Sequence, residues 1–142
     1  MPTYTLKLIG PVRLIAKDAT EKTPSSLKAR GILALLGTAQ HMRMSRPALT
    51  DKMWSTRSAK QGSDSLRQDI GAIRSATEPE ILITGNGWVE LNGDRVSVDL
   101  SPTETASWNT EFCADLDAIT DPEFTNWLRD MRARIEMERV SE

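Results

Sequence analysis

Histidine and cysteine are almost absent from this sequence of 142 residues, which contains only His41 and Cys113. A single cysteine cannot form an internal disulfide, and this favours a reducing, cytoplasmic setting. A single histidine argues against a metal site of histidine and cysteine ligands and against a histidine-based catalytic triad. His41 is interpreted as a surface or cap residue. We therefore predict that the protein uses no metal and no cofactor.

Long hydrophobic runs and glycine-rich phosphate-binding motifs are also lacking. The longest apolar run covers residues 32–36, whereas a membrane-spanning helix needs about 20 apolar residues. The N-terminus has no hydrophobic region typical of a signal peptide, so we predict no membrane association. Carboxylates gather at positions 115, 117, 121 and 123, but without histidine or cysteine they are interpreted as helix caps and solvated charge. We expect neither an enzyme nor catalytic residues.

The net charge of −2 conceals an uneven distribution along the chain. Residues 1–100 contain 14 Lys/Arg and 10 Asp/Glu, while residues 101–142 contain 4 and 10. The basic residues are densest between positions 43 and 74. Such a block can attract a polyanion while the acidic tail faces away or meets a protein. The alternative is a solvated surface of mixed charge.

The first 45 residues predict a small antiparallel sheet covered by a helix. Apolar residues alternate in segments 4–9 and 12–16, as in half-buried strands, and a Gly-Pro turn separates the two. Residues 17–24 are a candidate for a short third strand. Ser25 or Ser26 is a plausible cap for the most apolar segment, a core helix ending near Gly37. Residues 42–45 are interpreted as a brief extended link.

Two short helices joined by a polar loop are predicted next. Ser45 caps the first helix, Pro47 lies in its first turn, and Leu49, Met53 and Trp54 form its buried side. The polar, basic loop is placed at residues 55–62.

The second helix of this pair is predicted at residues 63–76, with Ser63 or Asp64 as its cap. Leu66, Ile70 and Ile73 recur at the spacing of one helical face. That spacing leaves an outward arc of polar and small residues, namely Arg67, Gln68, Gly71, Arg74 and Ser75. A helix held by one apolar seam that presents Arg, Gln and Ser is what reading the major groove of DNA requires.

After Pro79 the period changes from helix to strand. Segments 81–84, 88–91 and 95–98 read as strands, and glycine and asparagine between them are typical of tight hairpin turns. Sheet, core helix, helix pair and β-hairpin in this order indicate an α+β fold, the winged helix-turn-helix, with the hairpin as its wing. We predict this domain at residues 1–100 and a helical extension at residues 101–142.

Several blocks of the first hundred residues carry a family resemblance. They are LIGPVRL at 8–14, KAR at 28–30, Leu49 with Trp54, SLRQ at 65–68 with Ile73 and Arg74, and GWVEL at 87–91 with Val98 and Asp99. In order and spacing they resemble the DNA-binding domain of the SARP-type (AfsR-like) bacterial transcriptional activators, which have the OmpR/PhoB-type winged-helix fold. The resemblance implies a four-stranded N-terminal sheet, three helices and a wing, tandem binding to direct repeats, and a loop after the second helix that contacts RNA polymerase.

The tail predicts two further helices. Residues 101–120 place Trp108, Phe112 and Leu116 on one face, and Asp121 caps a last helix. The apolar stripe of that last helix, an expected interaction surface, is Phe124, Trp127, Leu128, Met131 and Ile135. The tail resembles the lead-in to the TPR-like activator domain of the same regulators. We expect either a fragment of a larger regulator or a short member whose last helix packs on its own domain or on a partner.

The predicted function is a sequence-specific DNA-binding transcriptional regulator, an activator by resemblance. The predicted base contacts are Arg67, Gln68, Gly71 and Arg74, and Gln68 is suited to adenine. The predicted contacts to the DNA backbone are Ser63, Ser65, Ser75, Lys28, Arg43 and Asn86. By resemblance, the predicted RNA polymerase loop contains Ser55, Thr56, Arg57, Lys60 and Gln61.

An alternative from another class is a winged helix used as a protein-interaction module. Two aspartates on the presumed reading helix, Asp64 and Asp69, and the acidic, aromatic tail motivate it. This alternative predicts self-association through the C-terminal helix or a protein partner, with weak, unspecific DNA binding.

Overall fold

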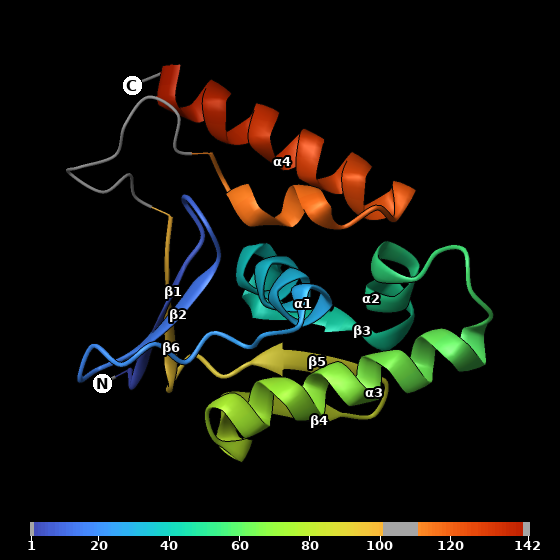
Figure 1. Ribbon diagram of the computed structural model, residues 1–142, viewed down its shortest axis with the longest axis horizontal. Coiled ribbons are helices and arrows are strands. Elements are labelled where there is room, and N and C mark those ends of the chain that lie inside the picture. The colour runs from blue at the N-terminus through green and yellow to red at the C-terminus, as the bar shows by residue number, and fades with distance from the viewer. Residues whose placement is uncertain (1, 101–110, 141–142) are drawn as a thin grey trace.

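The computed structural model describes residues 2–100 and 111–140. Within these residues the chain is a mixed α/β fold with four α-helices and two three-stranded sheets (Figure 1). The helices are α1 (Leu27–Thr38), α2 (Arg46–Met53), α3 (Ala59–Ala76) and α4 (Pro122–Val140). The strands are β1 (Tyr4–Lys7), β2 (Arg13–Ala16), β3 (Arg43–Ser45), β4 (Leu82–Gly85), β5 (Trp88–Leu91) and β6 (Val96–Asp99). Short 3₁₀ turns are η1 (Gln40–Met42), η2 (Pro79–Ile81) and η3 (Ala114–Ala118).

The N-terminal sheet has the strand order β2-β1-β6. The predicted β1–β2 hairpin is confirmed, but residues 17–24 form only an isolated bridge, between Ile15 and Glu21. The expectation that residues 95–98 extend the C-terminal hairpin is wrong, because β6 pairs in parallel with β1. A turn at Asn92 redirects the chain, and Val96 is then 1% exposed. The described sheet therefore has three strands, not the four that the resemblance implies.

Helix α1 is the centre of the core, as its apolar sequence predicts. Ser26 caps it by accepting a hydrogen bond from the Ala29 N–H. The helix ends at Thr38, which confirms the predicted end near Gly37, and Gly37 lies inside the last turn. An added Cβ at Gly37 would lie 3.1 Å from Leu6 of β1, so the missing side chain lets α1 lie directly on the sheet.

The pair α2 and α3 is present, but α3 begins earlier than predicted. Ser58 accepts from the Gln61 N–H while the Gln61 side chain accepts from the Ser58 N–H, which is a complete capping box. The placement of the cap at Ser63 or Asp64 is therefore wrong. The connection between α2 and α3 shortens to residues 54–58, and Lys60 and Gln61 belong to the first turn of α3.

Strands β4 and β5 form the predicted hairpin, with Gly87 at a φ of +84° in its turn. Strand β3 adds to its other side through β5, so residues 43–45 are a strand. Val89 and Leu91 point into the core and are fully buried. The backbone N–H of Arg46 donates to the Gly87 carbonyl at 2.9 Å, which holds the hairpin tip against the start of α2.

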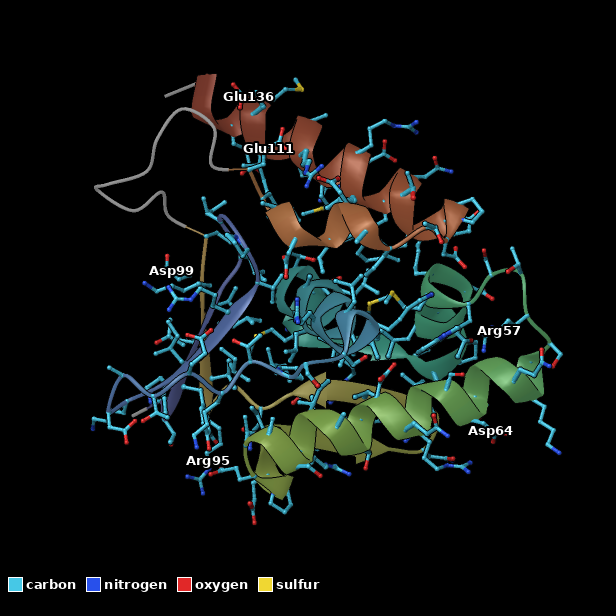
Figure 2. All side chains as sticks on the ribbon, in the orientation of Figure 1. Arg57, Asp64, Arg95, Asp99, Glu111 and Glu136 are labelled. Atoms are coloured by element: carbon cyan, nitrogen blue, oxygen red, sulfur yellow. The ribbon has the colours of Figure 1, made fainter. Side chains whose placement is uncertain are left out.

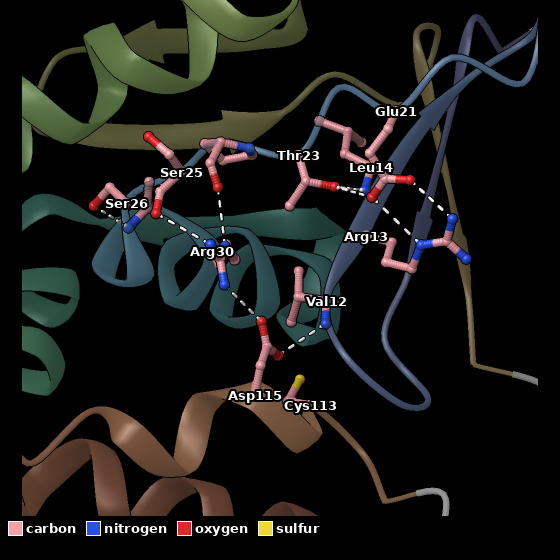
Figure 3. A network of polar contacts seen from close by, with 12 residues as sticks. Val12, Arg13, Leu14, Glu21, Thr23, Ser25, Ser26, Arg30, Cys113 and Asp115 are labelled. Atoms are coloured by element: carbon pink, nitrogen blue, oxygen red, sulfur yellow. Dashed lines mark hydrogen bonds and ion pairs between the residues drawn. The ribbon is translucent and has the colours of Figure 1, made fainter.

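The segment before α4 is not the predicted α-helix. Phe112 bridges to Ile9 and Gly10, and Leu116 lies in the turn η3. Trp108 lies outside the described residues. Figure 3 shows how Asp115 secures this segment: its carboxylate accepts from the Val12 N–H at 2.9 Å and from the guanidinium of Arg30 at 3.0 Å.

Helix α4 packs against α2, and the turn η3 before it packs against α1, on the side of the protein opposite α3 (Figure 1). Asp121 caps it as predicted, accepting from the Glu123 N–H at 2.9 Å. Phe124 and Leu128 are buried in the common core, and the rest of the predicted stripe is half-buried against it. The predicted interaction stripe thus packs within its own chain. No helix of the described residues is long and apolar enough to span a membrane.

Candidate nucleic-acid interface

The outward face of α3 is a continuous polar surface. Leu66, Ile70 and Ile73 anchor the helix in the core, as their spacing predicts. The exposed residues lie on the opposite side at helical spacing, and they are Lys60, Gln61, Ser63, Asp64, Arg67, Gln68, Gly71 and Ser75. We call these eight residues the α3 face. It has two basic side chains and one acidic one, and side chains project from it into solvent (Figure 2).

Three of the four predicted base contacts lie together on the α3 face. The side chain of Arg67 is 76% exposed, and its guanidinium lies 3.7 Å from the carboxylate of Asp64, one turn earlier. Gln68 follows it. Gly71, one turn further on, has no atom within 4 Å of the position that a Cβ would occupy. This leaves open space beside Arg67 and Gln68 for a close approach by another surface.

Arg74, the fourth predicted base contact, has a different position. Its guanidinium donates to the carbonyl of Pro79 at 3.1 Å and to that of Leu82 at 2.9 Å. These bonds tie the last turn of α3 to the start of strand β4. Two of the five N–H donors of Arg74 are thus used in holding the hairpin to the helix, and base reading by Arg74 stays a prediction.

The two aspartates of α3 have different environments. Asp69 is half-buried and accepts a hydrogen bond from Ser26, the cap of α1, at 3.0 Å. Burial raises the pKa of Asp69, although the Ser26 hydrogen bond and the nearby Lys28 oppose that rise. Asp69 therefore faces the interior, and Asp64 is the only carboxylate on the α3 face.

Lys28 is also half-buried. Its ammonium donates to the Met53 carbonyl and lies 5.3 Å from the centre of the Trp54 ring. Burial lowers its pKa, opposed in part by the charges of Asp121 and Asp69. This half-buried ammonium is used at the junction of α1 and α2, and a phosphate contact by Lys28 stays a prediction. Trp54, 6% exposed, is the core anchor that its spacing predicts.

The remaining predicted backbone contacts are scattered around the α3 face. Ser63 and Ser75 are exposed on it, whereas Ser65 is half-buried at its edge. Asn86 is exposed at the tip of the hairpin. Arg43 lies on the outer side of the β3–β5–β4 sheet, where its guanidinium is 3.9 Å from the centre of the Trp88 ring and 2.8 Å from Glu90.

The α2–α3 connection, residues 54–58, holds only part of the predicted RNA polymerase loop. Thr56 and Arg57 are exposed, and Arg57 lies at the end of the molecule where the connection turns (Figure 2). Ser55 donates to Asp121, and Ser58 is used as the α3 cap. The predicted polar loop at residues 55–62 is therefore replaced by a short connection that is fixed at both ends.

Arg46 belongs to the basic block noted between positions 43 and 74, but no contact was predicted for it. It begins α2 and borders an open groove of about 300 Å³ between α2 and the first turns of α3, together with Asp51, Arg57 and Ser63. Basic side chains beside the ends of two adjacent helices are suited to an anionic ligand. The position of Arg46 directly after the Ser45 cap was the available signal. Among residues 2–100 and 111–140 no cluster of metal-ligating side chains is present.

Comparison with known proteins gives a fold likeness only. No protein-family model matches the chain, and no curated protein matches it. Among solved structures it is similar to EmbR of Mycobacterium tuberculosis, determined in complex with a low-affinity phosphopeptide, with a TM-score of 0.55 and 18% sequence identity. The match covers 65% of this chain and 26% of the EmbR chain, so this chain spans about a quarter of that protein. At this identity the likeness shows a shared fold.

Proposed function

We propose that this chain is a winged-helix, sequence-specific DNA-binding regulator of the SARP type. Helix α3 enters the major groove with the α3 face toward the bases, and the β4–β5 hairpin acts as the wing. The observation that carries the proposal is the α3 face itself, where Arg67 and Gln68 extend beside the open position at Gly71. The fold shared with EmbR, a regulator of the SARP type, supports it.

The chemistry assigns different roles to the side chains on this face. Arginine suits guanine and glutamine suits adenine, because each can make two hydrogen bonds to the edge of that base in the major groove. Arg46 and Ser63 line the groove beside the first turns of α3, and Lys60 is exposed in its first turn. These three residues are suited to phosphates, which set affinity but carry no sequence information. Asp64 favours one orientation of the Arg67 guanidinium and disfavours phosphates nearby. No catalytic step or cofactor belongs to this function.

Activation and a contact with RNA polymerase are the finer part of the proposal. They are supported by the resemblance of the sequence to the SARP-type activators and by the exposure of Thr56 and Arg57 beside the α3 face. In the same proposal, two copies bind direct repeats, and the protein acts in the cytoplasm.

The first experiment is selection of a binding site from a random DNA pool, followed by fluorescence anisotropy titrations at several salt concentrations. We expect an enriched direct repeat that is bound at least about 1,000-fold more tightly than scrambled DNA. The slope of affinity against salt then counts the phosphates engaged. An unenriched pool with weak, wholly salt-dependent binding would contradict the proposal.

Arg67→Ala tests the assigned reader, and Arg129→Ala is its matched control. Both arginines are exposed, at 76% and 71%, and each lies beside an aspartate on its own helix. We expect Arg67→Ala to reduce discrimination by about 1–3 kcal/mol, the contribution of one bidentate base contact, and Arg129→Ala to leave it unchanged. Full discrimination by the Arg67→Ala protein would remove Arg67 from the reading surface.

A second candidate function is a winged-helix protein-interaction module. The ion pair of Asp64 with Arg67 favours it, because a mixed-charge face suits a protein surface better than a polyanion. Light scattering across a dilution series separates the two functions. A dimer that persists at nanomolar concentration without DNA supports the interaction module, whereas a monomer that assembles only on repeats supports the DNA-binding regulator.

A further inference from the structure

Asp121 is the only charged residue among the described residues that is buried, with 8% exposure. Its carboxylate accepts two hydrogen bonds from Ser55, one from the backbone N–H and one from the hydroxyl, each 2.7 Å long. It also accepts from the Glu123 N–H in the first turn of α4. One side chain therefore joins the start of α4 to a residue 66 positions earlier in the chain.

The carboxylate is ionised in this position. Burial alone would raise the pKa of Asp121, but the hydrogen bonds from Ser55 and from the backbone N–H groups of Glu123 and Phe124 outweigh burial and hold the pKa below its ordinary value. Hydrogen bonds to an ionised acceptor are shorter and stronger than neutral ones. The link between Asp121 and Ser55 is thus stronger than an ordinary surface contact.

Ser55 lies in the short connection between two closely packed helices. It is the second residue of the α2–α3 connection, between the buried Trp54 and the α3 cap Ser58. Helices α2 and α3 touch closely, since a Cβ at Gly62 would lie 3.3 Å from the Cβ of Thr50. With little slack in the connection, the position of Ser55 helps to set the angle between the two helices.

Helix α4, which Asp121 caps, is held in the core. Phe124 is fully buried and Leu128 is 3% exposed, so α4 is anchored in the core by its first two turns. Phe124 also contacts the Trp127 ring, with 5.2 Å between the ring centres. Because α4 is fixed to the core, Asp121 is a rigid point to which the connection is attached.

We propose that Asp121 is a positioning residue: it couples α4 to the α2–α3 connection and holds α3 at the angle at which the α3 face and the hairpin tip meet one DNA site. This inference rests on the proposed DNA-binding function. Sequence discrimination needs that angle, because base-edge hydrogen bonds tolerate little displacement. Unspecific attraction to phosphates depends mainly on charge and tolerates more.

The test measures the ratio of affinities for the selected DNA and for scrambled DNA at one salt concentration, in the full chain. Asp121→Asn and Ser55→Ala weaken the link. Glu123→Gln removes the same charge two residues away, at an exposed carboxylate that lies 3.9 Å from the ammonium of Lys52. Ser55→Thr keeps the hydroxyl at an exposed position. Circular dichroism establishes that each variant is folded, and hydrogen exchange follows the Ser55 amide.

We expect Asp121→Asn and Ser55→Ala to lower the ratio by about tenfold, which corresponds to about 1.4 kcal/mol, and to speed exchange of the Ser55 amide. The Glu123→Gln and Ser55→Thr proteins keep the wild-type ratio. Scrambled DNA binds Asp121→Asn and Glu123→Gln equally, since both variants change the net charge by the same amount.

Two results would overturn the positioning role. The first is an unchanged ratio in folded Asp121→Asn protein, and the second is an equal fall in Glu123→Gln, which would assign the effect to charge. If Asp121→Asn does not fold, Ser55→Ala decides the question by the same ratio. A wild-type protein without discrimination refutes the proposed function, and the positioning role falls with it. Discrimination that survives in every variant refutes the positioning role alone.

Discussion

Replacing Phe124 by alanine tests whether α4 is part of the folding unit or a separable appendage. The Phe124 ring is fully buried in the same core as the α1 side chains, although it lies near the C-terminal end of the chain. Truncating a buried phenylalanine costs about 3–5 kcal/mol, because apolar contact is lost and a cavity remains. Contact with the Trp127 ring places the expected loss in the upper part of that range.

The expected loss in the free energy of unfolding is large compared with the total stability of the protein. Domains of this size unfold with roughly 5–15 kcal/mol, so Phe124→Ala is expected to remove a substantial fraction of the stability. The assay is urea unfolding followed by tryptophan fluorescence and by circular dichroism, with coincident transitions expected from the two probes. Met137→Ala is the control on the same helix, because Met137 is 74% exposed and surface changes stay within about 0.5 kcal/mol.

A small effect would refute this reasoning. If Phe124→Ala costs less than about 1 kcal/mol, far below the usual cost of a core truncation, the α4 helix contributes little to the core. If α4 unfolds in a separate, earlier transition, the boundary at residue 100 that the sequence predicts describes two independent units. A single transition with a large loss shows one cooperative unit, in which α4 is available to act on the α2–α3 connection.

Three further changes test the described geometry. Gly71→Ala should raise the free energy of unfolding by about 0.5–1 kcal/mol, because Gly71 is exposed in a helix with open space at its Cβ position. Gly62→Ala on the same helix should lower the free energy of unfolding, because the new Cβ would press on the stiff side chain of Thr50. Thermal unfolding of the pair measures both, and equal effects would contradict the close approach of α2. Ser58→Ala should cost about 1 kcal/mol through loss of the N-cap, measured by urea unfolding, and no loss would argue that α3 begins later. Asp121 has a folded-state pKa below its ordinary value of 3.8, so its contribution to stability is complete above that value and is lost as the pH falls through the folded-state pKa. The stability difference between wild-type and Asp121→Asn proteins should therefore be largest near neutral pH and shrink in acid, and a difference independent of pH would show that the charge of Asp121 contributes nothing.

Patterns confined to a few neighbouring residues gave reliable predictions. Ser45 and Asp121 cap the helices that they were expected to cap, because a cap depends only on the next two or three N–H groups. The stripe of Leu66, Ile70 and Ile73 identified the buried side of α3, and with it the exposure of Arg67 and Gln68. The start of α3 was placed wrongly at Ser63 or Asp64, although Ser58 and Gln61 have the spacing of a capping box.

Tertiary structure alone decided the features that depend on distant partners. Strand β6 joins β1 and leaves the hairpin because its apolar side chains find the core there, and no local pattern distinguishes the two pairings. Arg74 and Lys28 resemble DNA contacts in the sequence, yet each donates to a backbone carbonyl that only the folded chain brings near. Ser55 meets Asp121 across 66 positions for the same reason. The sequence by itself determined which side of α3 is exposed, while the packed fold determined which of its basic residues remain available to bind.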